Sequence, residues 1–240
     1  MCDFAVIFDF NGTMLFDTQI QFRAWNDLAE ETLGHGLSEE EFLRCTNGRP
    51  SRETVEYFWG DVEEEQMEEL VARKRRKYKE LCLAHPEMFH LADGMTEVLD
   101  LLKEHEIPFT IATSSNPRSM DFYFEHLGLA AWFDRDAVIC SDRRFPGKPA
   151  PDIYRIAAQE LGFPPEQCIV VEDALAGAYA ARSAGIGYIV IIDPESSGSI
   201  WVGDQVDYVI NEYHELYEQL CNIMHAFHIE AQQNRKDELD

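Results

Sequence analysis

Basic residues are scarce in this chain of 240 residues, where 20 Lys and Arg stand against 45 Asp and Glu and give a formal net charge of −25. A surface of this sign repels phosphate backbones and anionic lipid headgroups, so we expect neither a nucleic-acid partner nor a membrane partner. No apolar run approaches the roughly 20 residues that a membrane span needs. The first ten residues have no basic stretch ahead of an apolar core, so we also expect no secretion signal.

Paired cysteines are missing as well. The six cysteines are scattered along the chain, and none form a Cys-x-x-Cys pair. This pattern predicts separate small apolar residues and argues against a disulfide framework or a zinc site. Cys140 and Cys168 lie in apolar runs and are interpreted as core residues. A reducing cytoplasmic location is the expectation that fits this usage.

Short apolar runs alternate with stretches that have the period of a helix. Nearly continuous apolar runs of four or five residues are typical of strands that are covered on both faces, as in a parallel sheet. The alternation therefore predicts an α/β fold, a doubly wound, Rossmann-like parallel sheet with helices on both faces. The predicted strands are Ala5–Phe8, Phe109–Ala112, Ala137–Cys140, Cys168–Val171, Tyr188–Ile192 and a weaker Val206–Ile210. The predicted helices between and after them are Gly94–Glu104, Pro117–His126, Pro151–Leu161, Ala174–Ala184 and Glu212–Ile229.

A long helical interval interrupts this alternation after the first strand. Four helices are predicted there, at Thr18–Leu33, Glu39–Cys45, Arg52–Trp59 and Val62–Leu83. We interpret the interval as an inserted all-helical cap domain of residues 17–87, and residues 1–16 and 88–240 as the catalytic core. The connections between the two are expected near Met14–Thr18 and His85–Leu91, where a few dihedrals can absorb a movement of the cap.

Polar residues follow several of the predicted strands. Asp9 follows the first strand, Thr113 the second, and Glu172-Asp173 the strand at Cys168, while Lys148 lies in a loop before a helix. In open α/β sheets ligands bind at the carboxyl ends of the strands, so these side chains should meet at one edge. Gathered carboxylates repel one another unless a cation lies between them, and Mg²⁺ prefers oxygen ligands. A lysine and a hydroxyl beside them suit a phosphoryl group.

Taken in order, these four motifs resemble the haloacid dehalogenase superfamily, in its phosphatase and phosphomutase branch with a helical cap. The resemblance covers nearly the whole chain and is strongest to the beta-phosphoglucomutases and related sugar phosphatases. The further segments that carry it are Phe22-Arg23-Ala24-Trp25, Ser51-Arg52-Glu53, Arg73-Lys74 and Lys148-Pro149-Ala150-Pro151-Asp152-Ile153. It implies a Mg²⁺-dependent enzyme that acts on a small phosphorylated metabolite, such as a sugar phosphate, as a monomer.

The resemblance also implies a role for each matching residue. Asp9 is expected to be the nucleophile that forms an aspartyl-phosphate. The groups expected to hold Mg²⁺ are Asp9, the backbone carbonyl of Asn11, Glu172 and Asp173. The groups expected to bind the phosphoryl are Thr113, the backbone N–H groups of Ser114 and Ser115, and Lys148. On the cap, Arg52 and Lys74 are expected to reach the far end of the substrate.

Two positions depart from the family pattern. The family has a second aspartate two residues after the nucleophile, as general acid and base, and this chain has Asn11. The beta-phosphoglucomutase-like cap has a histidine near that aspartate, and this chain has Gln21 at the matching position. An amide neither gives nor takes a proton at pH 7, so a factor of about 10²–10⁴ in rate is at stake.

The two amides favour hydrolysis over isomerisation as the reaction. Two alternatives stay open, namely a beta-phosphoglucomutase whose acid and base lie elsewhere, and a catalytically weakened module that binds a sugar phosphate. Replacing Asn11 by Asp is expected to restore the family pattern and to raise turnover by up to about 10²–10⁴.

Overall fold

The computed structural model describes residues 4–46, 50–141, 144–194 and 205–222, without the side chains of residues 44–46. The far end of the predicted helix Glu212–Ile229 and Cys2 lie outside these residues, as does the side chain of Cys45. The described cysteines Cys82, Cys140, Cys168 and Cys221 form no disulfide bond with one another. No described helix is long and apolar enough to cross a membrane.

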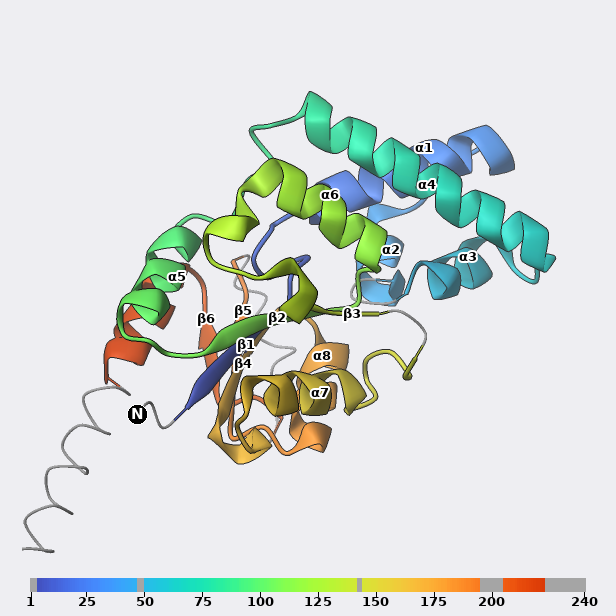
Figure 1. The fold of residues 1–240 in the computed structure, drawn as a ribbon. Helices are drawn as coiled ribbons and strands as arrows, with labels where there is room; N and C mark the ends of the chain where they lie inside the picture. The colour runs from blue at the N-terminus through green and yellow to red at the C-terminus, as the bar shows by residue number, and fades with distance from the viewer. Residues whose placement is uncertain (1–3, 47–49, 142–143, 195–204, 223–240) are drawn as a thin grey trace, which may run out of the picture.

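Six parallel strands form one sheet in the order β3-β2-β1-β4-β5-β6, which confirms the predicted fold class (Figure 1). The strands are β1 (Ala5–Phe8), β2 (Phe109–Thr113), β3 (Ile139–Cys140), β4 (Cys168–Glu172), β5 (Tyr188–Ile192) and β6 (Tyr208–Ile210). The order reverses direction at β1, which lies between β2 and β4. Ligand sites of such sheets lie at this kind of switch point.

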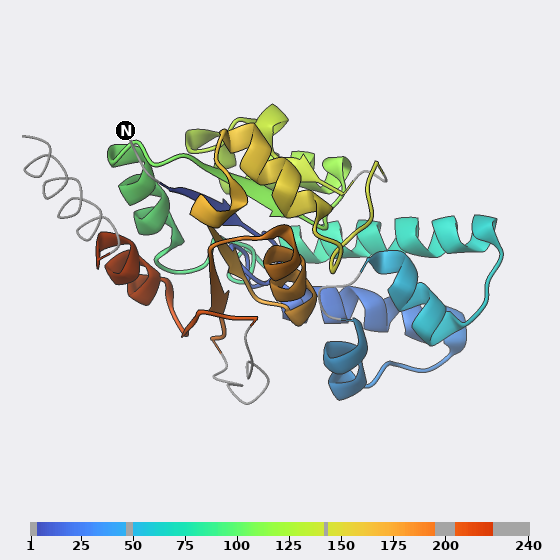
Figure 2. The same ribbon diagram turned by 90° about the horizontal axis from the view of Figure 1, so that it is seen from below.

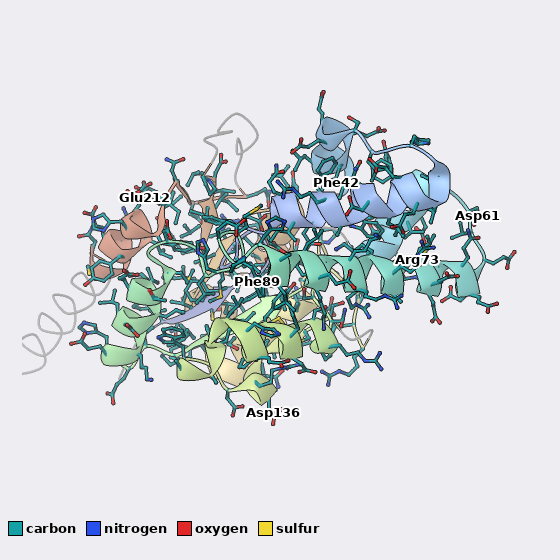
Figure 3. All side chains as sticks on the ribbon, turned by 90° about the horizontal axis from the view of Figure 1, so that it is seen from above. Phe42, Asp61, Arg73, Phe89, Asp136 and Glu212 are labelled. Atoms are coloured by element: carbon teal, nitrogen blue, oxygen red, sulfur yellow. The ribbon has the colours of Figure 1, made fainter. Side chains whose placement is uncertain are left out.

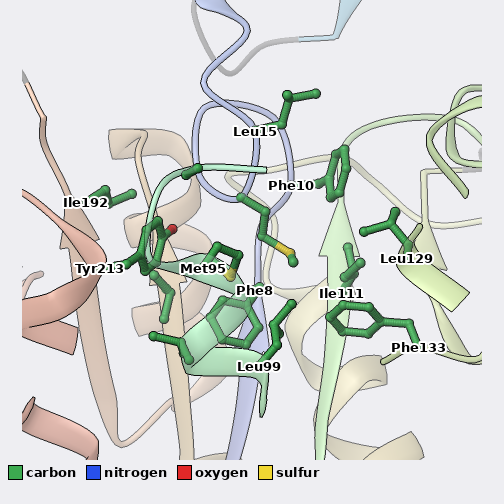
Figure 4. Packing of buried hydrophobic residues seen from close by; sticks show 14 of the residues in the cluster. Phe8, Phe10, Leu15, Met95, Leu99, Ile111, Leu129, Phe133, Ile192 and Tyr213 are labelled. Carbon is green, nitrogen blue, oxygen red and sulfur yellow. The ribbon is translucent and has the colours of Figure 1, made fainter. Parts of the chain in front are cut away.

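Alternate residues of β1 serve two different cores, because successive side chains of a strand point to opposite faces. Val6 and Phe8 pack in one buried cluster with α5 (Met95–Glu104), α6 (Pro117–Leu127) and the helical residues 213–222 (Figure 4). Ala5 and Ile7 pack in a second cluster with α7 (Asp152–Leu161) and α8 (Leu175–Ala184). Helices therefore cover both faces of the sheet, as Figure 2 shows from below.

Two predicted strands are shorter than the apolar runs suggested. The strand predicted at Ala137–Cys140 is limited to Ile139–Cys140, because Arg135–Ala137 form a short 3-10 helix. The carboxylate of Asp134 accepts a hydrogen bond from the backbone N–H of Asp136 at 3.0 Å and so turns the chain there. Likewise β6 begins at Tyr208 rather than at Val206. The predicted helices that lie wholly within the described residues agree with the structure within one or two residues at each end.

The four helices of the interval after β1 lie together on one side of the molecule (Figures 1 and 2). They are α1 (Thr18–Leu33), α2 (Glu39–Thr46), α3 (Ser51–Trp59) and α4 (Glu64–Ala84). A buried cluster of their own joins them, formed by Trp25, Leu28, Phe42, Val55, Met67 and Leu70. Seen from above, α1 and α4 run side by side, and the Arg73 guanidinium of α4 bonds to Glu31 of α1 at 2.9 Å (Figure 3).

The two segments that connect these helices with the sheet lie against each other. The backbone N–H of Ala92 donates a hydrogen bond to the carbonyl of Met14 at 2.8 Å. The chain thus leaves and re-enters the sheet layer at one place, at the carboxyl end of β1. We keep the cap boundaries at 17 and 87 as a prediction.

Candidate active site

A cavity of about 170 Å³ opens where the carboxyl ends of β1, β2 and β4 meet the four helices. Its sheet side is lined by Asp9 after β1, Thr113 at the end of β2 and Glu172 at the end of β4. These strands are neighbours in the sheet, so residues far apart in the sequence come together. Its other side is lined by residues of α1, α3 and α4, so the cavity is bounded by both layers.

Lys148 is the cation that contacts the carboxylates at the sheet side of this cavity. Its Nζ donates hydrogen bonds to Asp9 Oδ1 at 2.5 Å, to Glu172 Oε1 at 2.6 Å and to the carbonyl of Ala112 at 3.2 Å. The side chain is buried, which opposes its charge, but the carboxylates of Asp9 and Glu172 outweigh burial and raise the pKa of Lys148. The ammonium therefore stays charged at neutral pH and bridges two of the predicted site carboxylates.

Glu172 is held rigidly from several sides. Its Oε1 accepts a hydrogen bond from the Tyr154 hydroxyl at 2.7 Å, and its Oε2 accepts bonds from the backbone N–H groups of Asp173 and Ala174 at 2.9 and 3.0 Å. Burial opposes ionisation of Glu172, but the charge and hydrogen bond of Lys148 prevail and lower its pKa. Gly177 leaves the room for this carboxylate, because a Cβ there would lie 1.7 Å from Oε1.

The three acidic side chains that were predicted to hold a metal do converge. Asp9, Glu172 and Asp173 each offer an oxygen within 4.8 Å of the others. Burial, opposed by Lys148, raises the pKa of Asp9 to about 7. Burial and the charges of Glu172 and Asp9 raise the pKa of Asp173 well above its usual value. One buried lysine is too little to balance three carboxylates, so a hard divalent cation with oxygen ligands fits this donor set.

The segment after β2 provides hydroxyl and N–H donors at the same cavity. Thr113, Ser114 and Ser115 all line it, as predicted for phosphoryl ligands. The Thr113 hydroxyl oxygen accepts a hydrogen bond from the backbone N–H of Ser115 at 3.1 Å, which fixes the turn. The Ser115 hydroxyl donates to Asn11 Oδ1 at 2.7 Å.

The side chain of Asn11 is fully engaged by its neighbours. Its Nδ2 donates to Asp17 Oδ2 at 2.8 Å and to the Tyr123 hydroxyl at 3.0 Å, while its Oδ1 accepts the bond from Ser115. The orientation of the amide is therefore determined, and position 11 faces a carboxylate. Sequence patterns do not reveal this arrangement, because an aspartate just before a helix is usually an N-cap. Asp17 instead makes no side-chain cap bond to α1 and points inward.

The predicted substrate residues of the four helices have different surroundings. Gln21 lines the cavity and donates from Nε2 to Asp17 Oδ2 at 2.7 Å, while its Oε1 accepts a hydrogen bond from Lys74. Lys74 also lines the cavity, and its burial lowers its pKa to about 8. Arg52 lies outside the set of lining residues, and its guanidinium bonds to Glu64 at 2.9 Å. The structure thus brings Gln21 and Lys74, but not Arg52, to the site.

Asp17 changes what we expect from the substitution Asn11→Asp. The new carboxylate would lie beside the buried carboxylate of Asp17, and two such groups share a proton rather than ionise independently. We therefore expect Asn11→Asp to lower the unfolding temperature at pH 7 and to raise turnover by far less than 10²–10⁴. Thermal melts and steady-state kinetics measure both effects.

Asn26→Asp is the matched control, because Asn26 donates to the carboxylate of Glu30 at 3.0 Å on the exposed face of a helix. Solvent screens that repulsion, so its unfolding temperature should change little. A gain of two or more orders of magnitude in the turnover of Asn11→Asp would contradict this expectation.

The chain matches the haloacid dehalogenase-like hydrolase family over residues 6–191. It is 27% identical over 210 residues to hexitol phosphatase A of Escherichia coli, with 88% of this chain and 91% of the relative covered. It is 30% identical over 222 residues to beta-phosphoglucomutase of Bacillus subtilis, with 90% and 96% covered. A crystal structure of a family IA, variant 3 hydrolase from Entamoeba histolytica superposes with a TM-score of 0.80 at 34% identity, covering 88% of this chain and 94% of that one.

Proposed function

Because the chain belongs to the haloacid dehalogenase-like hydrolases, we propose that it is a phosphatase that removes phosphate from a phosphorylated sugar, with Asp9 as nucleophile. The observation that carries the proposal is the convergence of Asp9, Lys148, Glu172 and Asp173 at one cavity. The relatives named hexitol phosphatase A and beta-phosphoglucomutase support a sugar phosphate as substrate.

In the proposed reaction, a carboxylate oxygen of Asp9 attacks phosphorus, and the bond between phosphorus and the sugar oxygen breaks. The sugar leaves as an alcohol with a proton from solvent, because Asn11 has none to give. Water then attacks the aspartyl-phosphate, which releases inorganic phosphate and restores Asp9. Lys148 is placed to neutralise charge on the phosphoryl oxygens, and Thr113 and the N–H groups of Ser114 and Ser115 to bind them.

The groups that would hold Mg²⁺ are the carboxylates of Asp9, Glu172 and Asp173, with the backbone carbonyl of Asn11. When bound, the ion supplies positive charge next to the phosphoryl group, which lowers the barrier for attack by an anion. Because the pKa values of Asp9 and Asp173 are raised, these carboxyl groups bind protons in the metal-free protein. Binding of a cation displaces those protons.

This exchange of protons for metal gives a prediction about stability. A carboxyl whose folded pKa is raised binds more protons in the folded than in the unfolded state, so the metal-free protein loses stability as pH rises from about 4 to 7. We expect Mg²⁺ to raise the unfolding temperature more at pH 7.5 than at pH 5. At 100 times its Kd the ion contributes about 2.7 kcal/mol, which is roughly 5–10 °C for a chain of this size.

The measurement is thermal unfolding with Mg²⁺ and with chelator at the two pH values. Asp173→Asn is the matched variant, since it removes one carboxylate ligand and should reduce the shift at both pH values. An equal shift at pH 5 and 7.5, or none at all, would argue against metal binding at these carboxylates.

The activity itself is tested by phosphate release with and without Mg²⁺ from glucose 6-phosphate, glucose 1-phosphate, fructose 1-phosphate, a hexitol phosphate and an aryl phosphate. Metal-dependent release from a sugar phosphate supports the proposal. Interconversion of the two glucose phosphates without net release would support the mutase instead, which the 30% identity to the Bacillus subtilis enzyme favours. Binding of a sugar phosphate without turnover would identify a weakened binding module.

A further inference from the structure

Asp17 is a buried acidic residue for which the proposed reaction has no use, and burial raises the pKa of its carboxyl group against the hydrogen bonds of Tyr78, Gln21 and Asn11. The residue is 1% exposed, yet it is one of the residues that line the cavity. All three hydrogen bonds to its side chain end on the same oxygen, Oδ2. The donors are the Asn11 amide at 2.8 Å, the Gln21 amide at 2.7 Å and the Tyr78 hydroxyl at 2.5 Å.

The other carboxylate oxygen, Oδ1, accepts no hydrogen bond from the residues that the structure describes. Oδ1 is nevertheless not completely buried. Within the described part of the chain, the one fully buried side-chain nitrogen or oxygen without a partner is Nε of Arg182. Oδ1 is therefore nearly but not completely buried, and the space that Asp17 lines is the cavity. A buried carboxylate oxygen without a partner is costly, so a donor from a bound molecule would be favoured there.

We propose that Asp17 is a specificity-determining residue, whose Oδ1 accepts a hydrogen bond from a hydroxyl of the substrate's carbon skeleton while Oδ2 is held by the protein. This inference rests on the proposed function and narrows its substrate class. The substrate carries an uncharged hydroxyl close to the carbon that bears the phosphate. A substrate with an anionic group in place of this hydroxyl is excluded, because the Asp17 carboxylate would repel that group.

The surrounding cavity wall is consistent with recognition of a hydroxyl. The cation nearest to it, Lys74, lies over the rings of Trp25 and Tyr78 at 5.2 and 5.0 Å from the ring centres. It also donates to Gln21, which donates in turn to Asp17. Lys74 is thus linked to the carboxyl group of Asp17 through the amide of Gln21.

Asp17→Asn tests the proposal with little disturbance of the fold. The carbonyl oxygen of the new amide can accept the three bonds that Oδ2 accepts, so the change is concentrated at Oδ1, where an NH₂ group takes its place. A charge-assisted hydrogen bond to the substrate is lost, and we expect kcat/KM on the best sugar phosphate to fall about tenfold or more. On an aryl phosphate, which has no such hydroxyl, kcat/KM should stay within about threefold.

Tyr78→Phe is the matched control, because it removes a donor to Oδ2 and leaves Oδ1 in place. Its effect should be the same on the sugar and the aryl phosphate. If Asp17→Asn lowers kcat/KM equally on both substrates, Asp17 has only a structural role and the proposal is overturned. The proposed phosphatase activity is not affected by that outcome.

A binding measurement separates the two proposals if the parent protein releases no phosphate. The shift of the unfolding temperature by glucose 6-phosphate and by inorganic phosphate is compared in the parent and in Asp17→Asn. The proposal holds if the variant loses the extra shift with glucose 6-phosphate and keeps the shift with inorganic phosphate. It fails if both shifts are retained, if both are lost, or if glucose 6-phosphate gives the parent no extra shift.

Discussion

Asp9→Asn is expected to abolish turnover, with a fall in kcat of about 10⁴-fold or more, because an amide cannot form the covalent intermediate. The fold should survive. An amide oxygen can still accept the bond that Lys148 donates to Oδ1, and the cluster loses one of three mutually repelling carboxylates. We therefore expect kcat to fall without a matching loss of stability. A purely structural role for Asp9 would instead make activity and stability fall together.

The measurement is steady-state phosphate release together with a thermal melt. Asp193→Asn is the matched control, because Asp193 is a buried aspartate that directly follows β5, as Asp9 follows β1, and it is not one of the residues that line the cavity. Its kcat should stay within about threefold of the parent. Turnover of Asp9→Asn within a few-fold of the parent would remove Asp9 as nucleophile.

Lys148→Met has the largest expected effect on stability. It leaves the buried carboxylates of Asp9 and Glu172 without their shared cation, and removing one partner of a buried ion pair costs about 3–5 kcal/mol. Burial raises the pKa of Glu172 and Lys148 is the main group that lowers it, so removing Lys148 shifts that pKa upward. Protons can then replace the lost cation at low pH, and the loss of stability should be larger at pH 7.5 than at pH 5.

Denaturant unfolding at the two pH values measures this difference. Lys103→Met serves as its control, since Lys103 is exposed and its Nζ donates to the carbonyl of Ala131 at 2.9 Å. A surface change of this kind should alter the free energy of unfolding by no more than about 0.5 kcal/mol. A pH-independent loss for Lys148→Met would mean that the cost comes from lost packing and not from unpaired charge.

The sheet and its polar edge could be predicted from the sequence because both follow from local patterns. Runs such as Ala5–Phe8 are apolar on both faces, and the polar residues directly after them must lie at the carboxyl edge whatever the details of packing. The extent of β3 could not be predicted so well. The side chain of Asp134 caps a 3-10 helix at Arg135–Ala137, directly before β3, and this helix takes residues from the predicted strand.

The cap side of the site depends on contacts that no local pattern encodes. Asp17 is bonded to Tyr78, which is 61 residues away, and Asn11 is bonded to Tyr123, which is 112 residues away. Arg52 was predicted at the substrate from the family motif, but its guanidinium pairs with Glu64 at the start of α4. Helical period predicts which residues share a face, but it does not predict which neighbour that face meets.

The position of β1 in the middle of the sheet has a consequence for how the chain is made. Among the six described strands β1 is synthesised before the others, but its two neighbours begin only at residues 109 and 168. At about 5–20 residues per second, roughly ten seconds or more pass before both of its edges can be paired. The four helices at residues 18–84 are synthesised in that interval and can form from contacts within their own segment. The inserted segment therefore lengthens the time for which the strand that precedes Asp9 remains unpaired during synthesis.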